Sequence, residues 1–209
     1  MPAADTSYPA ADITGVVLAG GRARRMGGED KGLVEVEGKP MVVHALERLR
    51  PQVGAVVINA NRNLDVYRRL GGCEVVADTL GDFAGPLAGM ASAMAAARTR
   101  WVLTVPCDSP LLSRELGPRL WAAMSIAHAE GSVAHDGERM QPVFALLRTD
   151  LARSILEFLE GGGRKIDLWY AGRKLARGDL SDCPDTFLNV NTPEDRERLA
   201  ERLRSVAAC

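Results

Sequence analysis

Cysteine is scarce in this chain, and its few copies are not paired. The four cysteines among 209 residues are widely spaced, and none forms a CxxC motif: Cys73, Cys107, Cys183 and Cys209. Small disulfide-stapled domains and structural zinc sites both depend on closely spaced cysteines. Neither class fits the sequence, and the four residues are expected to be ordinary thiols.

Long apolar runs are also missing. No stretch approaches the roughly 20 apolar residues that a membrane-spanning helix needs. Met1 to Ala11 has neither the basic start nor the apolar centre of a secretory signal. The sequence therefore predicts a soluble, cytoplasmic protein with no membrane partner.

An excess of charge of either sign is absent too, because 26 Lys and Arg face 27 Asp and Glu, for a net charge of −1. A nucleic-acid binder must neutralise many phosphates, so nucleic acid is not an expected partner. The remaining expectation is a small-molecule ligand. The length and the 46% hydrophobic content suit one globular domain with a sizeable core.

Strand-like and helix-like segments alternate through the first half of the chain. Short apolar runs predict buried strands at Ile13 to Ala19, Ala55 to Ile58, Glu74 to Ala77 and Trp101 to Val105. Amphipathic or Ala-rich segments predict helices between them, at Met41 to Arg50, Leu64 to Leu70 and Pro86 to Ala97. This order predicts a doubly wound, Rossmann-like α/β fold with a mainly parallel sheet.

The two ends of the chain carry weaker patterns. Residues 1–11 lack periodicity and are expected to be a disordered N-terminal extension, which leaves 12–209 as a single domain. Beyond Trp121, strands are expected at Gly131 to Ala134, Pro142 to Leu147 and Thr186 to Val190, and helices at Leu151 to Glu160 and Pro193 to Ser205. We assign a second substrate to this half and the first ligand to the half ending near residue 120.

The densest chemical pattern directly follows the first predicted strand. From Leu18 to Lys31 the chain reads LAGGRARRMGGEDK, with four glycines, three arginines and a lysine. Glycines let backbone N–H groups approach a polyphosphate closely, and the cations offset its charge. The segment predicts a triphosphate-binding loop.

Two common phosphate motifs do not occur in this loop, since neither GxGxxG nor GxxxxGK[ST] can be read there. Dinucleotide-dependent reduction and P-loop hydrolysis both lose support. A solvated basic turn would explain the charges. It would not explain their place at the carboxyl end of a strand, where open α/β sheets bind ligands.

Asp108 ends the segment WVLTVPCD, at the carboxyl end of a strand predicted to be central. Mg²⁺ binds one or two carboxylates together with phosphate oxygens and water, so Asp108 is a candidate metal ligand. Alone, the same residue would serve equally well as a helix N-cap.

Taken together, five segments resemble the bacterial molybdenum cofactor guanylyltransferase family. They are the glycine-rich loop, Val57 to Asn61 (VINAN), Gly85 to Met90 (GPLAGM), Pro106 to Asp108 (PCD) and Asn189 to Glu194 (NVNTPE). The resemblance runs from about Ile13 to Arg204, with the segments in the family's order. Gly20 stands where the related cytidylyltransferases usually have Ala, which favours guanine.

The resemblance implies a role for each matching residue. The residues that would contact GTP are Leu18, Ala19, Gly20, Lys31, Asn59, Asp78 and Asp108, with Gly21 and Gly28 in the loop that holds the pyrophosphate. Asp108 would also bind Mg²⁺. Arg25 and Lys31 would offset phosphate charge during catalysis, and Asn189 and Asn191 would lie near molybdopterin and the transferred phosphate.

Simpler interpretations of the asparagines remain open. Asn59 and Asn61 follow a strand and would serve as turn formers. Asn189 would end a strand ahead of Thr192 and Pro193, which are typical of a helix start.

The resemblance also implies the reaction: molybdopterin attacks the α-phosphorus of GTP and pyrophosphate leaves. The expected partners are GTP, molybdenum-bearing molybdopterin, and proteins that deliver molybdopterin or mature molybdoenzymes. The alternatives are a molybdopterin cytidylyltransferase, a sugar-phosphate nucleotidyltransferase, or a non-catalytic GTP-binding module.

Overall fold

In the computed structural model, which describes residues 7–21, 30–79, 85–190 and 192–207, the chain forms a seven-stranded sheet. Its order is β5-β4-β1-β6-β8-β7-β9. The strands are β1 Ile13–Leu18, β4 Ala55–Asn59, β5 Glu74–Val76, β6 Trp101–Pro106, β7 Gly131–His135, β8 Met140–Arg148 and β9 Leu175–Asp179. All neighbouring pairs are parallel except those of β8, which runs antiparallel to β6 and β7. The prediction of a mainly parallel sheet is confirmed.

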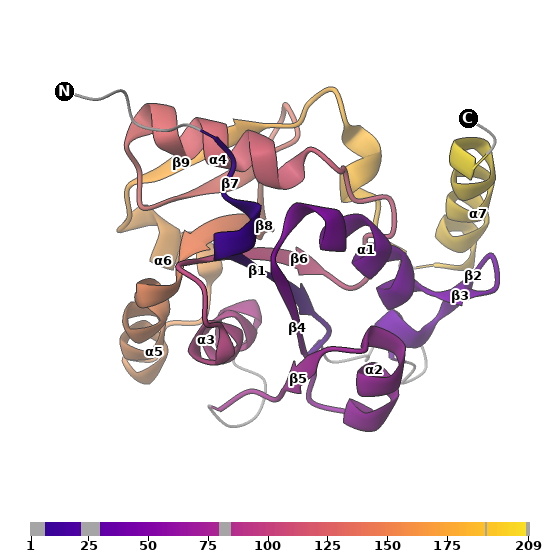
Figure 1. Cartoon of the computed structure of the whole chain (residues 1–209), viewed down its shortest axis with the longest axis horizontal. Coiled ribbons are helices and arrows are strands. Elements are labelled where there is room, and N and C mark those ends of the chain that lie inside the picture. The colour runs from indigo at the N-terminus through magenta and orange to yellow at the C-terminus, as the bar shows by residue number, and fades with distance from the viewer. Residues whose placement is uncertain (1–6, 22–29, 80–84, 191, 208–209) are drawn as a thin grey trace.

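Helices cover both faces of this sheet (Figure 1). The helices of the first 190 residues are α1 Met41–Leu49, α2 Leu64–Gly71, α3 Pro86–Ala96, α4 Leu116–Ala127, α5 Ala152–Glu160 and α6 Ile166–Ala171. Helices α1, α2 and α4 share one apolar cluster, and α3, α5 and α6 share another. Alternate side chains of β1 separate in the same way: Val17 belongs to the first cluster and Val16 to the second. The doubly wound prediction is therefore confirmed.

Helix α3 is apolar all round, and it is buried accordingly. Its sequence, PLAGMASAMAA, begins with Pro86 at the first turn, directly after Gly85, whose φ is +78°. Glycine adopts such a φ without strain, and proline is suited to the first turn of a helix. The small side chains let α3 lie between the sheet and α5.

The second half of the sheet differs from the sequence prediction at one strand. The expected strand at Thr186 to Val190 is wrong: Pro184–Phe187 forms a 3-10 helix, and Leu188 to Val190 has no regular structure. The strand that completes the sheet is β9. Its sequence LARGD has neither β-branched nor aromatic residues, so it lacks the usual composition of a strand.

Part of the predicted N-terminal extension is ordered. Tyr8 Oη donates a 2.7 Å hydrogen bond to the carbonyl of Gln52, and Ala10–Asp12 forms a 3-10 helix that leads into β1. The expectation of disorder up to Ala11 is therefore corrected for residues 7–11. Residues 1–6 lie outside the described part of the chain.

The last helix, α7 Pro193–Ala207, starts as the sequence predicts. The Asp195 N–H donates to Thr192 Oγ1 at 3.1 Å, and the Thr192 N–H donates to Asp195 Oδ2 at 3.0 Å. This reciprocal pair is a capping box. In Figure 1 the helix lies beside the two-stranded hairpin of β2 Glu35–Val36 and β3 Lys39–Pro40, and Leu199 packs there with Val36.

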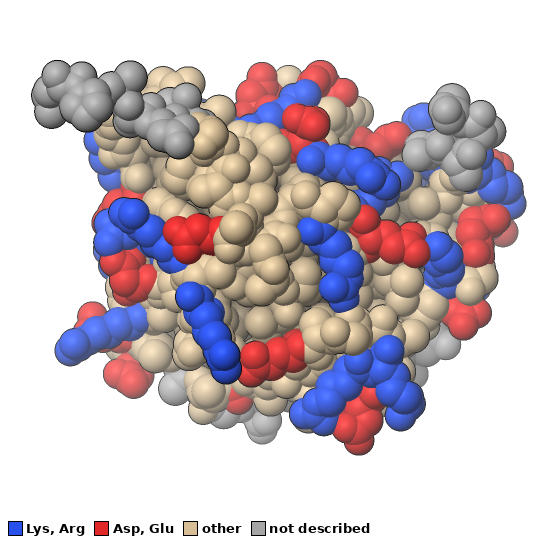
Figure 2. Space-filling view, viewed as in Figure 1, with Lys and Arg blue, Asp and Glu red and all other residues tan. Residues whose placement is uncertain are grey.

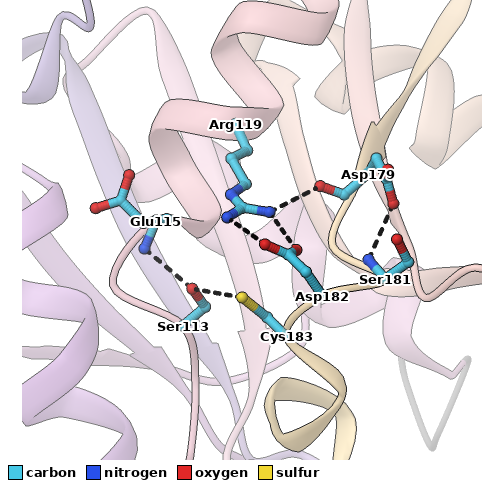
Figure 3. Close-up of polar contacts among 7 residues, drawn as sticks. All are labelled: Ser113, Glu115, Arg119, Asp179, Ser181, Asp182 and Cys183. Carbon is cyan, nitrogen blue, oxygen red and sulfur yellow. Dashed lines mark hydrogen bonds and ion pairs between the residues drawn. The ribbon is translucent and has the colours of Figure 1, made fainter.

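Arg119 on α4 ties that helix to the segment after β9 (Figure 3). Its guanidinium donates to both carboxylate oxygens of Asp182, at 2.5 and 2.9 Å, and to the carbonyl of Asp179 at 3.4 Å. Nearby, Ser113 Oγ donates to Cys183 Sγ at 4.0 Å. Because the Arg119 and Asp182 side chains are 34% and 62% exposed, water screens their ion pair, which mainly orients the segment.

The surface view shows charges of both signs. In Figure 2, Lys and Arg side chains alternate with Asp and Glu over the visible face. This agrees with the near-zero net charge of the sequence. In the described part of the chain, no helix is long and apolar enough to cross a membrane.

Candidate active site at the carboxyl edge of the sheet

The predicted site residues lie near the point in the sheet where the order of strand addition changes direction. From β1 the chain adds β4 and β5 on one side and then β6 on the other. In open α/β sheets this reversal leaves a crevice beyond the carboxyl ends of the strands. The residues after β1, β4, β5 and β6 line two adjoining cavities at this edge.

The larger of the two, the Asp78 cavity, has a volume of about 370 Å³, within the range of small-molecule sites. Its lining residues in the described part of the chain are Leu18, Gly20, Gly21, Asn59, Asp78, Gly85, Pro86, Pro106 and Val143. Four of the nine were predicted to contact GTP, and a fifth, Gly21, was predicted to lie in the loop that holds the pyrophosphate.

Two asparagines hold the Asp78 carboxylate. Asn59 Nδ2 donates to Asp78 Oδ1 at 2.9 Å, and Asn61 Nδ2 donates to Asp78 Oδ2 at 2.8 Å. Asn61 Oδ1 in turn accepts the Asp78 backbone N–H at 2.8 Å. Each carboxylate oxygen retains a further lone pair for a ligand. Asn61, for which the sequence left the role of a turn former open and to which it assigned no GTP contact, thus fixes a predicted ligand-binding residue.

Glycines make room for this arrangement. A Cβ on Gly89 of α3 would overlap Asn59 Oδ1 and lie 2.9 Å from Asn59 Cγ. A Cβ on Gly20 would lie 3.0 Å from both Asn59 Oδ1 and Asn61 Nδ2. The glycine at position 89 therefore allows a close contact between helix α3 and the end of β4, and that contact is with Asn59.

The second cavity, the Asp108 cavity, has a volume of about 230 Å³. Among the described residues it is lined by Leu18, Ala19, Gly21, Asp30, Lys31, Cys107 and Asp108. Lys31 Nζ lies 3.2 Å from Asp108 Oδ2, with side chains 29% and 14% exposed. Because Leu18 and Gly21 line both cavities, one ligand can occupy the two together.

Asp30 is a member of this cavity that the sequence analysis did not single out. Tyr67 Oη donates to Asp30 Oδ1, and Asn63 Nδ2 donates to Asp30 Oδ2 at 3.0 Å. Burial raises the pKa of Tyr67, so its hydroxyl remains a donor at neutral pH. Tyr67 and Asn63 lie more than 30 residues along the chain, so no local pattern pointed to Asp30.

The donor set of the Asp108 cavity fits Mg²⁺. Asp30 and Asp108 supply carboxylate oxygens, and the described residues contain no cluster of three or more His, Cys, Asp or Glu. Mg²⁺ is commonly held by one or two carboxylates and completed by substrate phosphates, rather than enclosed by protein. The neighbouring Cys107 is unsuited to chemistry there, because burial raises the pKa of its thiol well above its usual value.

The C-terminal segment reaches the same edge. Ser109, buried next to Asp108, donates from Oγ to Asn189 Oδ1 at 2.7 Å. Asn189 therefore lies close to the Asp108 cavity but is not among its lining residues. Three other predicted site residues, Arg25, Gly28 and Asn191, lie outside the described residues. The roles of all these residues stay predictions.

Known proteins resemble this chain in sequence and fold. A family model described as the MobA-like NTP transferase domain matches residues 15–174. The molybdenum cofactor guanylyltransferase of Shewanella piezotolerans is 50% identical over 91% of this chain and 93% of its own length. That of Shewanella sp. (strain MR-4) is 52% identical over 91% and 96%.

The fold likeness extends to a solved structure. Molybdopterin-guanine dinucleotide biosynthesis protein A from Archaeoglobus fulgidus superimposes with a TM-score of 0.73 at 21% identity, covering 92% of this chain and 99% of that one. This likeness concerns the fold. The identity of 50% and 52% to the two Shewanella proteins, together with the family model, shows that the chain belongs to the molybdenum cofactor guanylyltransferase family, with a MobA-like NTP transferase domain at residues 15–174.

Proposed function

We propose that this nucleotidyltransferase transfers GMP from GTP to molybdopterin, forming the guanine dinucleotide cofactor and releasing pyrophosphate. One observation carries the proposal. A carboxylate held by two amides, that of Asp78, lines a nucleoside-sized cavity that adjoins a second cavity containing Lys31 and Asp108.

The Asp78 carboxylate suits guanine among the nucleobases. Guanine presents two neighbouring N–H donors on its Watson–Crick edge, and a carboxylate can accept both side by side. Adenine and cytosine each place a ring-nitrogen acceptor beside their amino group, so an ionised carboxylate would face one lone pair. Because Asn59 and Asn61 orient both oxygens, Asp78 is prepared for this contact.

The phosphates would then lie in the Asp108 cavity. Lys31 offers an ammonium group there, and the backbone N–H groups of Gly20 and Gly21 follow directly on β1. Arg25 and Gly28 belong to the same glycine-rich loop and are proposed to hold the leaving pyrophosphate. This arrangement supplies positioning and charge stabilisation, which dominate phosphoryl-transfer catalysis.

Asp108, together with Asp30, would hold Mg²⁺ beside Lys31. The metal supplies Lewis-acid stabilisation of charge on the phosphate oxygens. The transfer itself is a displacement: an oxygen of the molybdopterin phosphate bonds to the α-phosphorus of GTP, and the bond from that phosphorus to the bridging oxygen breaks. Since the attacking phosphate is already ionised, no protein base is needed.

Family membership also leads us to expect protein partners that deliver molybdopterin and mature molybdoenzymes, in the cytoplasm. The nearest alternatives are cytidylyl transfer, the transfer of a nucleotide to a sugar phosphate, and GTP binding without chemistry. The orientation of Asp78 favours guanine over cytosine, and the pairing of Lys31 with Asp108 next to the nucleoside cavity favours catalysis over simple binding.

A transfer assay tests the proposal. Purified protein is given molybdopterin, Mg²⁺ and α-labelled GTP, CTP or ATP, and pyrophosphate and the dinucleotide are measured. We expect GTP to be preferred by roughly 100-fold or more, because two hydrogen bonds to a charged group are at stake. Chelation of Mg²⁺ should stop turnover. A preference for CTP would assign the cytidylyl reaction, and tight GTP binding without pyrophosphate release would show a binding module.

A further inference from the structure

An open cleft lies next to the Asp78 cavity and has no assigned ligand. We call it the arginine cleft. It has a volume of about 810 Å³, and its wall includes Arg139, Gln141, Pro142, Tyr170, Arg173 and Arg177. These residues come from the turn before β8 and the start of that strand, from α6 and the turn after it, and from β9. All lie in the half of the chain to which the sequence assigned a second substrate.

The cleft carries an excess of positive charge. Its lining contains three arginines and one carboxylate, that of Asp167. Among the described residues the Arg177 side chain has no hydrogen-bond or ion-pair partner, and Arg139 is 79% exposed, with a long ion pair of 3.9 Å to Asp136 Oδ2. Two guanidinium groups thus remain available to an anionic ligand, which guanidinium binds in a bidentate manner.

The third arginine is already held in place. The Arg173 guanidinium stacks over the Trp169 ring, 5.4 Å from its centroid, and donates to Ser154 Oγ. A stacked guanidinium loses little further freedom when it binds a ligand. Arg173 therefore has a fixed place in the cleft, with its charge partly offset by Glu130 Oε1 at 4.0 Å, while Arg139 and Arg177 supply adjustable contacts.

The arginine cleft and the Asp78 cavity are separated by a single bulge of β8. Val143 lines the Asp78 cavity, and its neighbour Pro142 lines the cleft. The register between β7 and β8 shifts here: Val133 pairs with Ala145 and Ala134 pairs with Gln141, so residues 142–144 lie outside the regular pairing. Thr104 Oγ1 donates to the Val143 carbonyl and Tyr170 Oη donates to the Pro142 carbonyl, each at 2.7 Å.

These two hydrogen bonds hold the Pro142–Val143 backbone, which separates the arginine cleft from the Asp78 cavity, in place. Burial raises the pKa of Tyr170, so its hydroxyl stays protonated and keeps donating. Met140 pairs with His135, the last residue of β7, so the start of β8 lies at the carboxyl edge of the parallel strands. A ligand in the cleft would consequently lie beside a nucleotide in the Asp78 cavity.

We propose that the arginine cleft binds the acceptor, and that Arg139 and Arg177 are contacts for the anionic groups of molybdopterin. The inference rests on the proposed guanylyl transfer, which requires an anionic heterocyclic phosphate next to GTP. The cleft volume lies within the range of small-molecule sites. Two features favour this cleft as the molybdopterin site. Its arginines match the negative charge of molybdopterin, and Pro142 in its wall is the chain neighbour of Val143, which lines the nucleotide cavity.

Arg139→Gln and Arg177→Gln test the proposal, because each removes one positive charge and keeps a polar, uncharged side chain. The KM for molybdopterin is measured in the transfer assay, the affinity for GTP by titration calorimetry, and the folded state by thermal melting. We expect each variant to raise the KM for molybdopterin about tenfold or more and to leave GTP affinity and melting temperature unchanged. Arg69→Gln is the matched control, since Arg69 is exposed on α2 at the opposite end of the sheet.

Two results would overturn the assignment of the cleft. One is an unchanged KM for molybdopterin in both variants. The other is an equal loss of GTP affinity, which would give the cleft to the nucleotide. If the wild-type protein transferred no GMP, the proposed function would fail instead. Anaerobic calorimetric titration with molybdopterin alone would then still decide whether Arg139 and Arg177 bind it.

Discussion

Side chains at the carboxyl edge of the sheet are oriented by partners distant in the chain. Asn61 holds Asp78 at two points, and Tyr67 holds Asp30 from α2. A Cβ on Gly32 would lie 2.5 Å from Tyr67 Oη, so the absence of a side chain there leaves room for that hydroxyl. Asp78 and Asp30 therefore each depend on a neighbour that never needs to touch the nucleotide.

Asn61→Ala should separate positioning from turn formation. The variant loses the donor to Asp78 Oδ2 and the acceptor for the Asp78 N–H, which should cost about 1 kcal/mol of stability for each hydrogen bond. If Asn61 positions Asp78, affinity for GTP should also fall, by about fivefold or more, while affinity for ATP stays low. Denaturant unfolding and nucleotide titration on the same protein measure both quantities. A destabilised variant with unchanged GTP affinity would leave Asn61 as a turn former.

At the scale of elements, α3 brings its backbone close to the end of β4. The contact is possible because position 89 is glycine and most of its neighbours in the helix are small. Glycine inside a helix costs about 1 kcal/mol relative to alanine. The glycine leaves space for the Asn59 side chain, which is buried and donates a hydrogen bond to Asp78.

Gly89→Ala should therefore destabilise the protein although alanine favours the helix. The added Cβ would displace Asn59 and leave a buried amide without its partner, a cost of about 1 to 3 kcal/mol that exceeds the gain in helix propensity. GTP affinity should fall with it. Gly161→Ala at the end of α5 is the control: its φ is −70°, its Cβ would meet nothing closer than 3.4 Å, and its effect should stay within about 0.5 kcal/mol. If denaturant unfolding showed both variants to be equally stabilised, the proposed clash between a Cβ at position 89 and Asn59 would be contradicted.

At the scale of the whole molecule, the sequence predicted the elements whose patterns are local and missed those that depend on distant contacts. The apolar runs of β1, β4 and β6 identify buried parallel strands, and parallel strands end at one edge. Gly20 and Asp108 could therefore be placed together in advance, whereas Asn59 was assigned only through the family resemblance. β9 was missed because an edge strand that packs against α4 through small residues needs no strongly apolar pattern: a Cβ on Gly178 would lie 2.5 Å from Leu120 Cδ2.

The C-terminal segment joins the two halves of the chain at the site. Ser109 and Asn189 are 80 residues apart and share a hydrogen bond beside Asp108. Beyond Asn189, Val190 and Leu199 pack in one apolar cluster with Val36 of the β2–β3 hairpin. The segment is thus attached both to the end of β6 and to the hairpin, which gives the Asn189 amide a defined place.

A comparison of two single variants, Ser109→Ala and Asn189→Ala, should show whether the Asn189 amide takes part in guanylyl transfer. Each variant loses the same hydrogen bond and should lose about 1 kcal/mol of stability, so thermal melting cannot distinguish them. If Asn189 acts on the acceptor or the transferred phosphate, Asn189→Ala should lower the transfer rate about tenfold or more. Ser109→Ala should lower it less, because the amide remains but is less firmly oriented. GTP affinity should be unchanged in both. Two variants that are equally destabilised and retain the full transfer rate would reduce Asn189 to an anchor for the segment before α7.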